Sequence, residues 1–413
     1  MSPESRQGAL RRRLTGSAAT PGVLQRRFSP EQLAFAGIFV VTMLGLLAIG
    51  ATLPVLPLYV RGPIGAGDVS VGVVTGAFAI TGLAFRPFGG YLADTRGRRR
   101  VVVAGSLLTA LAGVLYFIPA GIGGLIVARL VLGAGEALVY AAGAAWVFDL
   151  APVRKQGRFI GFYGLAIWGG LALGAPVGQV LLDVASFEVV WAFAAAAPLL
   201  GAAIALRIPE AYQPRRSAES HSLVVREALV PGTGLALGTV GFTTVSAFIV
   251  LHLDDLGLGH GAEVFTVLAI SVVAVRLFGG GIPDRFGGGP SAVAAGILSA
   301  VGLLIIAAAQ TLGVALVGAV VLGAAFSLTF PALSLLVVER VPPERRGFAL
   351  GTFTAFFDIG VGLGTPIAGA IAALSGYPAA FVFAAVCALG LAAVGVVSTP
   401  RGGRTATQPG PVT

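Results

Sequence analysis

Twelve long apolar runs constrain this chain more than any other feature of its sequence. A transmembrane helix needs about 20 consecutive apolar residues, and charges, prolines and glycine clusters cut the sequence into runs of about this length. The runs are residues 35–59, 71–92, 101–118, 122–147, 158–182, 189–206, 231–251, 262–282, 291–309, 311–337, 348–374 and 379–397. The sequence therefore predicts an all-α integral membrane protein with twelve transmembrane helices.

Composition excludes a soluble globular protein. Of the 413 residues, 56% are apolar and only 11% are charged, whereas about a quarter of the residues of a soluble domain are charged. A net charge of +9 is also common in nucleic-acid-binding proteins, but here the basic residues form short clusters between the apolar runs. This arrangement is typical of membrane topology, so no nucleic-acid partner is expected. The single cysteine, Cys387, excludes an intrachain disulfide.

The basic clusters also predict the orientation of the chain. If the first run starts on the inner side, the inner segments hold 23 of the 27 Lys and Arg residues. We therefore predict a multi-pass protein of the plasma (cell inner) membrane with both termini in the cytoplasm. The arginine-rich segment 1–33 is interpreted as a cytoplasmic tail in preference to a transit peptide, and its processing is left open.

The chain contains an internal repeat at an offset of 190 residues. Segment 85–97 matches 275–287, so that Arg86 falls on Arg276 and Asp94 on Asp284. The same frame places Gly170, Gly174 and Pro176 on Gly360, Gly364 and Pro366. We therefore predict a duplicated architecture. Its parts are a cytoplasmic tail 1–33, a six-helix half 34–206, a cytoplasmic linker 207–230, a six-helix half 231–397 and a cytoplasmic tail 398–413.

Three motifs carry a family resemblance. The run Gly90-x-Leu-Ala-Asp94-x-Arg-Gly97-Arg98-Arg99, between the second and third spans, resembles a signature of the major facilitator superfamily. Arg129-x-x-Leu-Gly-x-Gly resembles the fourth-helix signature of that family. The segment from Gly170 to Gly178 resembles its fifth-helix signature, which is associated with drug and metabolite antiporters. The resemblance covers residues 35–397 and implies the twelve-helix fold of this family.

The first motif implies a latch at the inner side of the membrane. By resemblance, Asp94 faces the amino end of the eleventh helix, and Arg98 pairs with Asp149 at the inner end of the fourth, which locks the outward-facing state. A carboxylate at a helix amino end gains about 0.3 to 2 kcal/mol. Gly90, Gly97 and Arg99 belong to the same latch. The alternative is that these arginines only enforce topology.

Three charged residues within the apolar runs are candidates for proton coupling or substrate binding: Arg129, Glu136 and Asp358. A rise of about 1.5 Å per residue places Glu136 and Asp358 near the midplane of the membrane and Arg129 in its outer half. Charges at this depth are costly and often functional, and burial of a carboxylate favours its protonated form. The alternatives are structural: polar contacts between helices, a cap on a broken helix, or pairing of Asp358 with Arg276.

Glycines and aromatic residues supply further candidates. Gly170, Gly174 and Gly178 recur every four residues beside Pro176. The resemblance connects this row with antiport, and close helix packing is the alternative explanation. Candidates for substrate contact are the aromatic residues Tyr140, Trp168 and Phe330.

The predicted function is secondary transport by alternating access. We expect proton-coupled efflux of small amphiphilic, drug-like or sugar-like molecules, because of the fifth-helix motif. The alternatives are nutrient uptake by symport or facilitation, and a transport-inactive sensor or scaffold on the same fold. The expected partners are a small-molecule substrate, protons and the lipid bilayer, and the expected state is a monomer.

Enzymatic activity is not expected. The sequence shows no nucleophile–base set, no metal-ligand spacing and no phosphate-binding loop, so neither a catalytic residue nor a metal or other cofactor is predicted. The histidines and acids between residues 252 and 263 are interpreted as a solvated outer loop in preference to a metal site.

Overall fold

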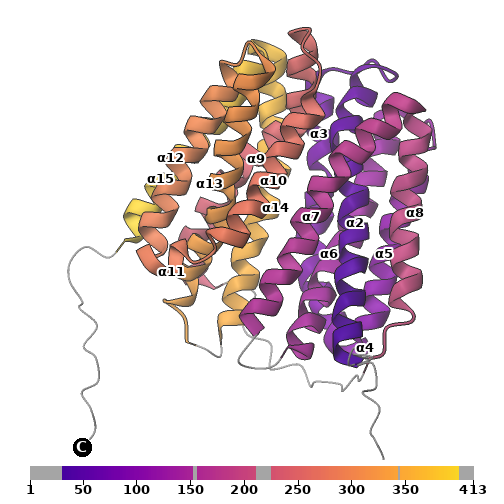
Figure 1. Cartoon of the computed structure of the whole chain (residues 1–413), viewed down its shortest axis with the longest axis vertical. Helices are drawn as coiled ribbons and strands as arrows, with labels where there is room; N and C mark the ends of the chain where they lie inside the picture. The colour runs from indigo at the N-terminus through magenta and orange to yellow at the C-terminus, as the bar shows by residue number, and fades with distance from the viewer. Residues whose placement is uncertain (1–29, 152–155, 211–224, 343–344, 400–413) are drawn as a thin grey trace, which may run out of the picture.

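The computed structural model describes residues 30–151, 156–210, 225–342 and 345–399. Within these ranges the chain folds into helices and short connections, without a strand. Figure 1 shows two groups of helices side by side, one from each half of the chain. Much of the predicted tails and linker, residues 1–29, 211–224 and 400–413, lies outside the described residues.

The first half begins with a long helix and alternates in direction from span to span. Its helices are α2 (Pro30–Arg61), α3 (Asp68–Gly76), α4 (Phe78–Arg96), α5 (Arg98–Leu115), α6 (Gly121–Leu150), α7 (Gln156–Val184) and α8 (Phe187–Ala205). Together α3 and α4 form one span, Asp68–Arg96.

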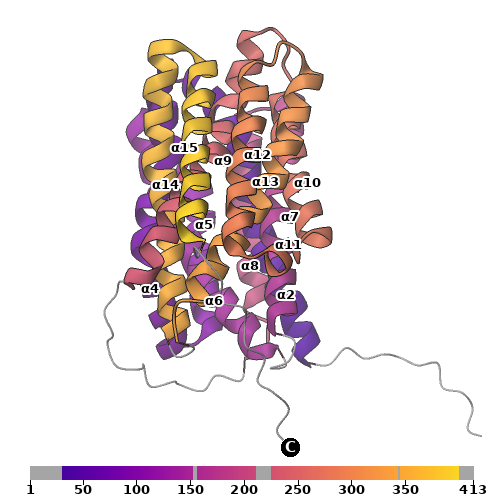
Figure 2. The ribbon, with the colours of Figure 1, turned by 90° about the vertical axis from the view of Figure 1, so that its left-hand side faces the viewer.

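The second half repeats this order. Its elements are η2 (Arg226–Ala228), α9 (Leu229–Asp255), α10 (Gly261–Phe278), α11 (Ile282–Phe286), α12 (Gly288–Ala307), α13 (Leu312–Val338), α14 (Arg346–Ser375) and α15 (Tyr377–Ser398). Figure 2, turned by 90°, shows α14 and α15 beside each other.

The number of spans agrees with the sequence prediction. Eleven segments of the described chain are long and apolar enough to cross a membrane. The remaining predicted run, residues 101–118, corresponds to α5, whose first turn carries three arginines, 98 to 100. Charges in a terminal turn stand at the membrane boundary, where long side chains reach the headgroups. The all-helical, twelve-span fold is therefore confirmed.

The repeat is visible in the turns as well as in the helices. Gly97, between α4 and α5, has φ 96°, and its counterpart Gly287, between α11 and α12, has φ 85°. Residues with a Cβ avoid this left-handed region, so glycine permits the sharp turn at both places. The same backbone turn therefore follows the second span of each half.

The two ends of the bundle differ. We call the end where α2 starts, α4 ends and α15 ends the basic end, because Arg96 and Arg98 to Arg100 lie there, and the opposite end the far end. At the far end the two halves are in close contact. A Cβ added at Gly72 would lie 2.5 Å from the carbonyl oxygen of Thr365, and the Tyr377 hydroxyl donates to Asp68 Oδ1 at 2.9 Å. The halves are thus packed together at the far end.

Candidate functional site

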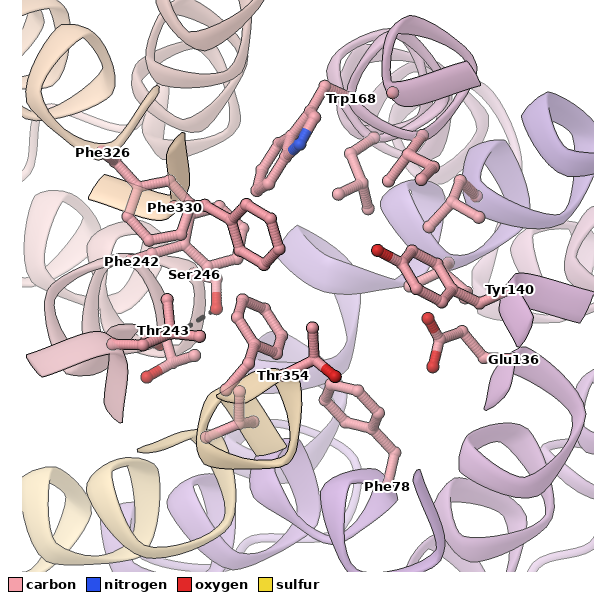
Figure 3. A pocket seen from close by; sticks show the side chains of 18 of the residues that line it. Phe78, Glu136, Tyr140, Trp168, Phe242, Thr243, Ser246, Phe326, Phe330 and Thr354 are labelled. Carbon is pink, nitrogen blue, oxygen red and sulfur yellow. Dashed lines mark hydrogen bonds between the residues drawn. The ribbon is translucent and has the colours of Figure 1, made fainter. Parts of the chain in front are cut away.

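A cavity of about 250 Å³ lies between the two halves. Figure 3 shows its walls, with Tyr140 and Glu136 on one side and the aromatic residues Phe242, Phe326, Phe330 and Trp168 across from them. On α14 its lining residues are Thr354, Phe357 and Val361, in the part of the helix nearer the basic end. The cavity therefore occupies the middle of the bundle and extends away from the closed far end.

Arg86 is the central charge of this cavity. It lies in the middle of α4, and its guanidinium donates to the Asp358 carboxylate twice, with Nε to Oδ2 at 2.6 Å and Nη2 to Oδ1 at 3.0 Å. The Asp358 side chain, from α14, is fully buried. Such a two-point contact is among the strongest that an arginine makes. This ion pair therefore joins the two halves across the cavity.

Glu136 and Tyr140 complete the surroundings of Arg86. Both come from α6, one turn apart. Glu136 Oε2 lies 3.5 Å from Arg86 Nη2, and the guanidinium carbon lies 4.9 Å from the centre of the Tyr140 ring. One cation thus stands between two carboxylates that belong to opposite halves. With both acids ionised the group carries a net negative charge, and one bound proton makes it neutral.

Gly82 leaves room for this ion pair. A Cβ at Gly82, one turn before Arg86 on α4, would lie 3.2 Å from Asp358 Oδ1. The missing side chain lets the carboxylate of α14 approach the surface of α4.

A second arginine, Arg276, lies in the opposite wall. It comes from α10, and its guanidinium carbon lies 5.6 Å from the centre of the Trp168 ring of α7. The ring packs edge-on against Phe242 and Phe326, with centroids 5.5 Å away in both cases. Arg276 therefore lies over an aromatic cluster, and no carboxylate among the described residues forms an ion pair with it.

The two arginine environments are related by the internal repeat. The offset of 190 residues takes Arg86 to Arg276 and Tyr140 to Phe330. It also takes Glu136 to Phe326 and Trp168 to Asp358. All of these residues except Asp358 line the cavity directly, and Asp358 contacts it through Arg86. The structure thus brings together five residues that the sequence named as site candidates: Glu136, Tyr140, Trp168, Phe330 and Asp358.

Arg129 is not among the residues that line the cavity. It is fully buried and donates to the carbonyl oxygens of Val74 at 3.3 Å and Thr75 at 2.8 Å. These carbonyls belong to the end of α3, next to the junction with α4 at Ala77. Arg129 therefore points toward α3, and the described contacts do not join it to Glu136. Its contacts match the structural alternative.

The glycine row of the fifth span packs against the first. A Cβ at Gly170 would lie 2.8 Å from the Met43 carbonyl oxygen, and Gly174 and Gly178 face the α2 backbone as closely. Pro176 lies within the uninterrupted helix α7. Close packing within the first half therefore accounts for this row.

The latch residues lie together at the basic end. Arg98 Nη2 is 2.9 Å from Asp149 Oδ2 and 3.3 Å from Asp94 Oδ1, so the predicted pair of Arg98 and Asp149 is present. The contact predicted between Asp94 and the amino end of α14 adjoins residues 343–344, which lie outside the described part of the chain, and stays a prediction. The gating role of the group is likewise untested.

Other latch positions have structural explanations. The backbone N–H groups of Arg98 and Arg99 donate to the carboxylate of Glu210. Glu210 thus caps the start of α5, a role that the sequence did not suggest. At Gly90 an added Cβ would meet nothing within 4 Å, so no close backbone approach requires this glycine.

One further expectation was wrong. His252, assigned to a solvated loop, is buried within α9 and packs edge-on against Phe381 at 5.4 Å. The helix continues to Asp255, beyond the predicted end of the seventh run.

Two functional candidates were missed by sequence reasoning, Arg86 and Arg276. Both had a detectable signal, because each is an arginine inside an apolar run and the two are repeat partners. What the sequence did not show was which helix faces point into the cavity.

Comparison with known proteins agrees with this architecture. The family model described as Major Facilitator Superfamily matches residues 38–291 and, in a second match, residues 232–412. The chain belongs to the major facilitator superfamily. Among its relatives in this superfamily is an uncharacterized MFS-type transporter of Salmonella typhimurium, 36% identical over 359 residues, or 85% of this chain and 92% of the relative. An uncharacterized MFS-type transporter of Burkholderia mallei is 33% identical over 371 residues, 88% of this chain and 91% of the relative.

Solved structures of the major facilitator superfamily share the fold. The nucleoside transporter NupG, in a mutant form, superposes with a TM-score of 0.77 at 14% identity, covering 89% of this chain and all of NupG. The human organic anion transporter MFSD10 gives a TM-score of 0.67 at 18% identity, covering 89% of this chain and all of that one. These structures show the shared fold, and the family model together with the relatives above identifies the chain as a membrane transporter of the MFS type.

Proposed function

We propose that this MFS transporter is proton-coupled, and that it exports small amphiphilic molecules in exchange for protons. One observation carries the coupling: Arg86 stands between two carboxylates, Asp358 and Glu136, which come from opposite halves of the protein. A group of one cation and two acids inside a membrane has an available site for one proton, and its charge changes when that proton binds.

Protonation of Asp358 would weaken the contact between the halves. The ionised carboxylate holds α14 against α4 through two charge-assisted hydrogen bonds. A neutral carboxyl group loses the charge attraction, and Arg86 then keeps Glu136, in its own half, as its only carboxylate partner among the described contacts. A contact that exists in one conformation biases the equilibrium between two conformations by its free energy. Proton binding can therefore favour the rocking of the halves.

The cavity and the closed far end fit one conformation of an alternating-access cycle. The halves meet closely at Gly72 and Tyr377 at the far end, while the cavity extends toward the basic end. In the opposite conformation the basic end would close, and the latch of Arg98 and Asp149 would meet the start of α14. We place the basic end in the cytoplasm on the distribution of basic residues.

The direction of transport rests on the resemblance of the fifth-helix motif to antiporters. Because packing against α2 accounts for its glycines, the structure adds no independent support for efflux. Uptake by proton symport is the alternative that the same charge group permits.

The test is transport by the purified protein in liposomes with an imposed pH gradient, over a panel of amphiphilic compounds. We expect Asp358→Asn to abolish gradient-driven transport and to spare exchange of labelled for unlabelled substrate, since exchange needs no net proton movement. Glu136→Gln should have a smaller effect, because its carboxylate lies farther from Arg86. Asp183→Asn, an exposed acid at the far end, is the matched control.

Three results would decide against the proposal. Movement of substrate and protons in the same direction would replace antiport by symport. Unchanged pH dependence in both cavity variants would exclude coupling through this group. No transport of any compound would favour the sensor alternative.

A further inference from the structure

We propose that Arg276 and Trp168 form a docking site for an anionic group, so that the cargo is a small organic anion with an apolar body. The inference rests on the proposed function in one respect, namely that cargo occupies this cavity.

The first argument is the unmatched charge of Arg276. The described residues place no carboxylate within ion-pair distance of it, whereas its repeat partner Arg86 has two. Its Nε atom is buried without a hydrogen-bond partner. Its Nη1 atom lies beside Gly164, where an added Cβ would come within 3.1 Å. Arg276 thus keeps donor capacity that no protein group of the described chain fills.

An arginine in this position is expensive unless a partner joins it. Arg276 is half-buried. Partial burial of a charge without a partner still costs free energy inside a membrane protein, and contact with an indole ring recovers only part of this cost. A carboxylate or a similar oxyanion would fill the free donors of the planar guanidinium, in two-point geometry where space allows. The local chemistry therefore favours an anion.

The second argument is the wall beside Arg276. Phe242 and Phe326 stack with their ring planes 12° apart and centroids 5.0 Å apart, and both pack against Trp168. These rings face the cavity in Figure 3. A flat or aliphatic body can bury its surface against them while its charged group reaches Arg276. The volume of about 250 Å³ is below that of pockets for drug-sized ligands, roughly 300 to 1,000 Å³, so the body is small.

A cationic cargo is the competing possibility. Glu136 Oε2 is buried without a hydrogen bond and could attract an ammonium group. However, that oxygen lies 3.5 Å from Arg86, so a cation in the cavity would compete with Arg86 for Glu136 and would also be repelled by Arg276, which faces the same cavity. An anion can instead pair with Arg276, for which the described residues supply no carboxylate.

The experiment compares three probes with one body and different charges: phenylbutanoate, phenylbutanol and phenylbutylamine. Affinities for the purified full-length protein are measured by calorimetry at neutral pH without a gradient. We expect the anion to bind at least about tenfold more tightly than the alcohol, as for a hydrogen bond to a charged group, and the amine to bind most weakly. Equal affinities, a preference for the amine, or no binding of any probe would overturn the proposal.

Variants at position 276 test whether Arg276 is the residue that causes the preference for the anionic probe. Arg276→Gln should lower the affinity for phenylbutanoate to about that for the alcohol, a loss of roughly tenfold or more, and leave alcohol binding unchanged. Arg276→Lys should keep part of the preference, because it keeps the charge but loses the planar fork. Arg285→Gln is the matched control, since Arg285 also lies over an aromatic ring, Phe286, but is exposed outside the cavity.

The outcomes separate this inference from the proposed function. If Arg276→Gln does not fold, the probe series on the unaltered protein still decides. An anion preference without proton-coupled transport would leave the docking site standing and remove the coupling. Proton-coupled transport restricted to cations or neutral compounds would support the coupling and refute the docking site. An anion preference that survives in Arg276→Gln would show that the anion binds at another residue.

Discussion

Arg86 and Arg276 occupy equivalent positions in the two halves, yet their partners are opposite in character. Arg86 pairs with the buried carboxylate of Asp358, which reaches it from the other half. Arg276 lies over Trp168, which stands at the position equivalent to Asp358 and also reaches across from the other half. Both contacts join equivalent positions across the two halves, but one is a two-point ion pair and the other a cation over an aromatic ring.

The difference suggests how a duplicated fold can assign proton binding to one arginine and cargo binding to the other. Duplication places one arginine in each wall of a central cavity, facing the partner half. An acid opposite the first arginine makes a group whose charge depends on a proton, as proposed above. A ring opposite the second leaves the arginine's hydrogen-bonding capacity open for cargo. The side chains that differ around the two equivalent arginines are Trp168 against Asp358, and Glu136 against Phe326.

The largest expected effect comes from removing the first arginine. Arg86→Gln leaves Asp358 buried without its cation, and breaking a buried pair in this way costs about 3 to 5 kcal/mol. We expect a lower unfolding temperature in detergent and loss of transport. The double variant Arg86→Gln with Asp358→Asn should recover part of the stability, because Asp358 no longer carries an unpaired charge while Glu136 still lacks its cation, and it should show no transport driven by a pH gradient. A stable single variant with normal transport would contradict the assigned role of this pair.

Giving Arg276 an acidic partner like that of Arg86 is a sharper test of the comparison. Trp168→Asp places a carboxylate opposite Arg276, as Asp358 stands opposite Arg86. The new acid should pair with Arg276 and compete with cargo, so that phenylbutanoate binds roughly tenfold or more weakly. Trp168→Phe keeps the aromatic surface and should change the affinity only by a few fold. Equal losses in both variants would mean that packing, and not charge, determines binding.

The glycine rows offer a structural comparison of the halves. A Cβ at Gly174 would meet backbone atoms of α2, including Gly50 Cα at 2.8 Å, whereas at Gly364 it would meet the side chain of Val240, with Cγ2 at 2.7 Å. A side chain can turn away more easily than a helix backbone can shift. Gly174→Ala should therefore destabilise the protein by about 1 to 3 kcal/mol, and Gly364→Ala by less. Chemical denaturation in detergent measures both, and the reverse order would refute this account.

The smallest expected effect concerns the latch. Arg98 falls on Gly288 in the second half, where a Cβ would lie 2.6 Å from the Ala332 carbonyl oxygen. The second half therefore has no room for an arginine at this position. Because Asp149 is partly exposed and the buried Arg98 keeps Asp94 as a second acidic partner, a double-mutant cycle of Arg98→Gln and Asp149→Asn should give a coupling of about 1 kcal/mol. A coupling several times larger would show that this pair holds the conformation on its own.

The fold was largely predictable, because the features that determine it can be read directly along the sequence. Runs of apolar residues, basic clusters between them and a gap-free repeat suffice to place the spans. The depth of Glu136 and Asp358 also followed from counting residues along a helix. Depth along the helix axis, however, does not show which way a side chain points around that axis.

The partners in the site were not predictable, because they depend on how helices rotate about their axes. Arg129 and Glu136 share one face of α6 by spacing, yet Arg129 turns to carbonyl groups of α3 while Glu136 faces the cavity. Asp358 was given Arg276 as its candidate partner, and the structure pairs it with Arg86. Rotation is determined by packing against neighbouring helices, such as the contacts of Gly174 with α2, and no single segment contains that information.

Gly164 carries a consequence for the relatives of this chain. Its missing side chain provides the space in which Arg276 Nη1 lies, so residues 164 and 276 act as a pair although they belong to different halves. A transporter with glycine and arginine at these two places is expected to select organic anions. In a relative with a larger residue at 164 the guanidinium would have to shift, by a few tenths of an ångström for alanine and by more for a longer side chain. Under the docking proposal, residues 164 and 276 are therefore the two positions to compare with the charge of each relative's cargo.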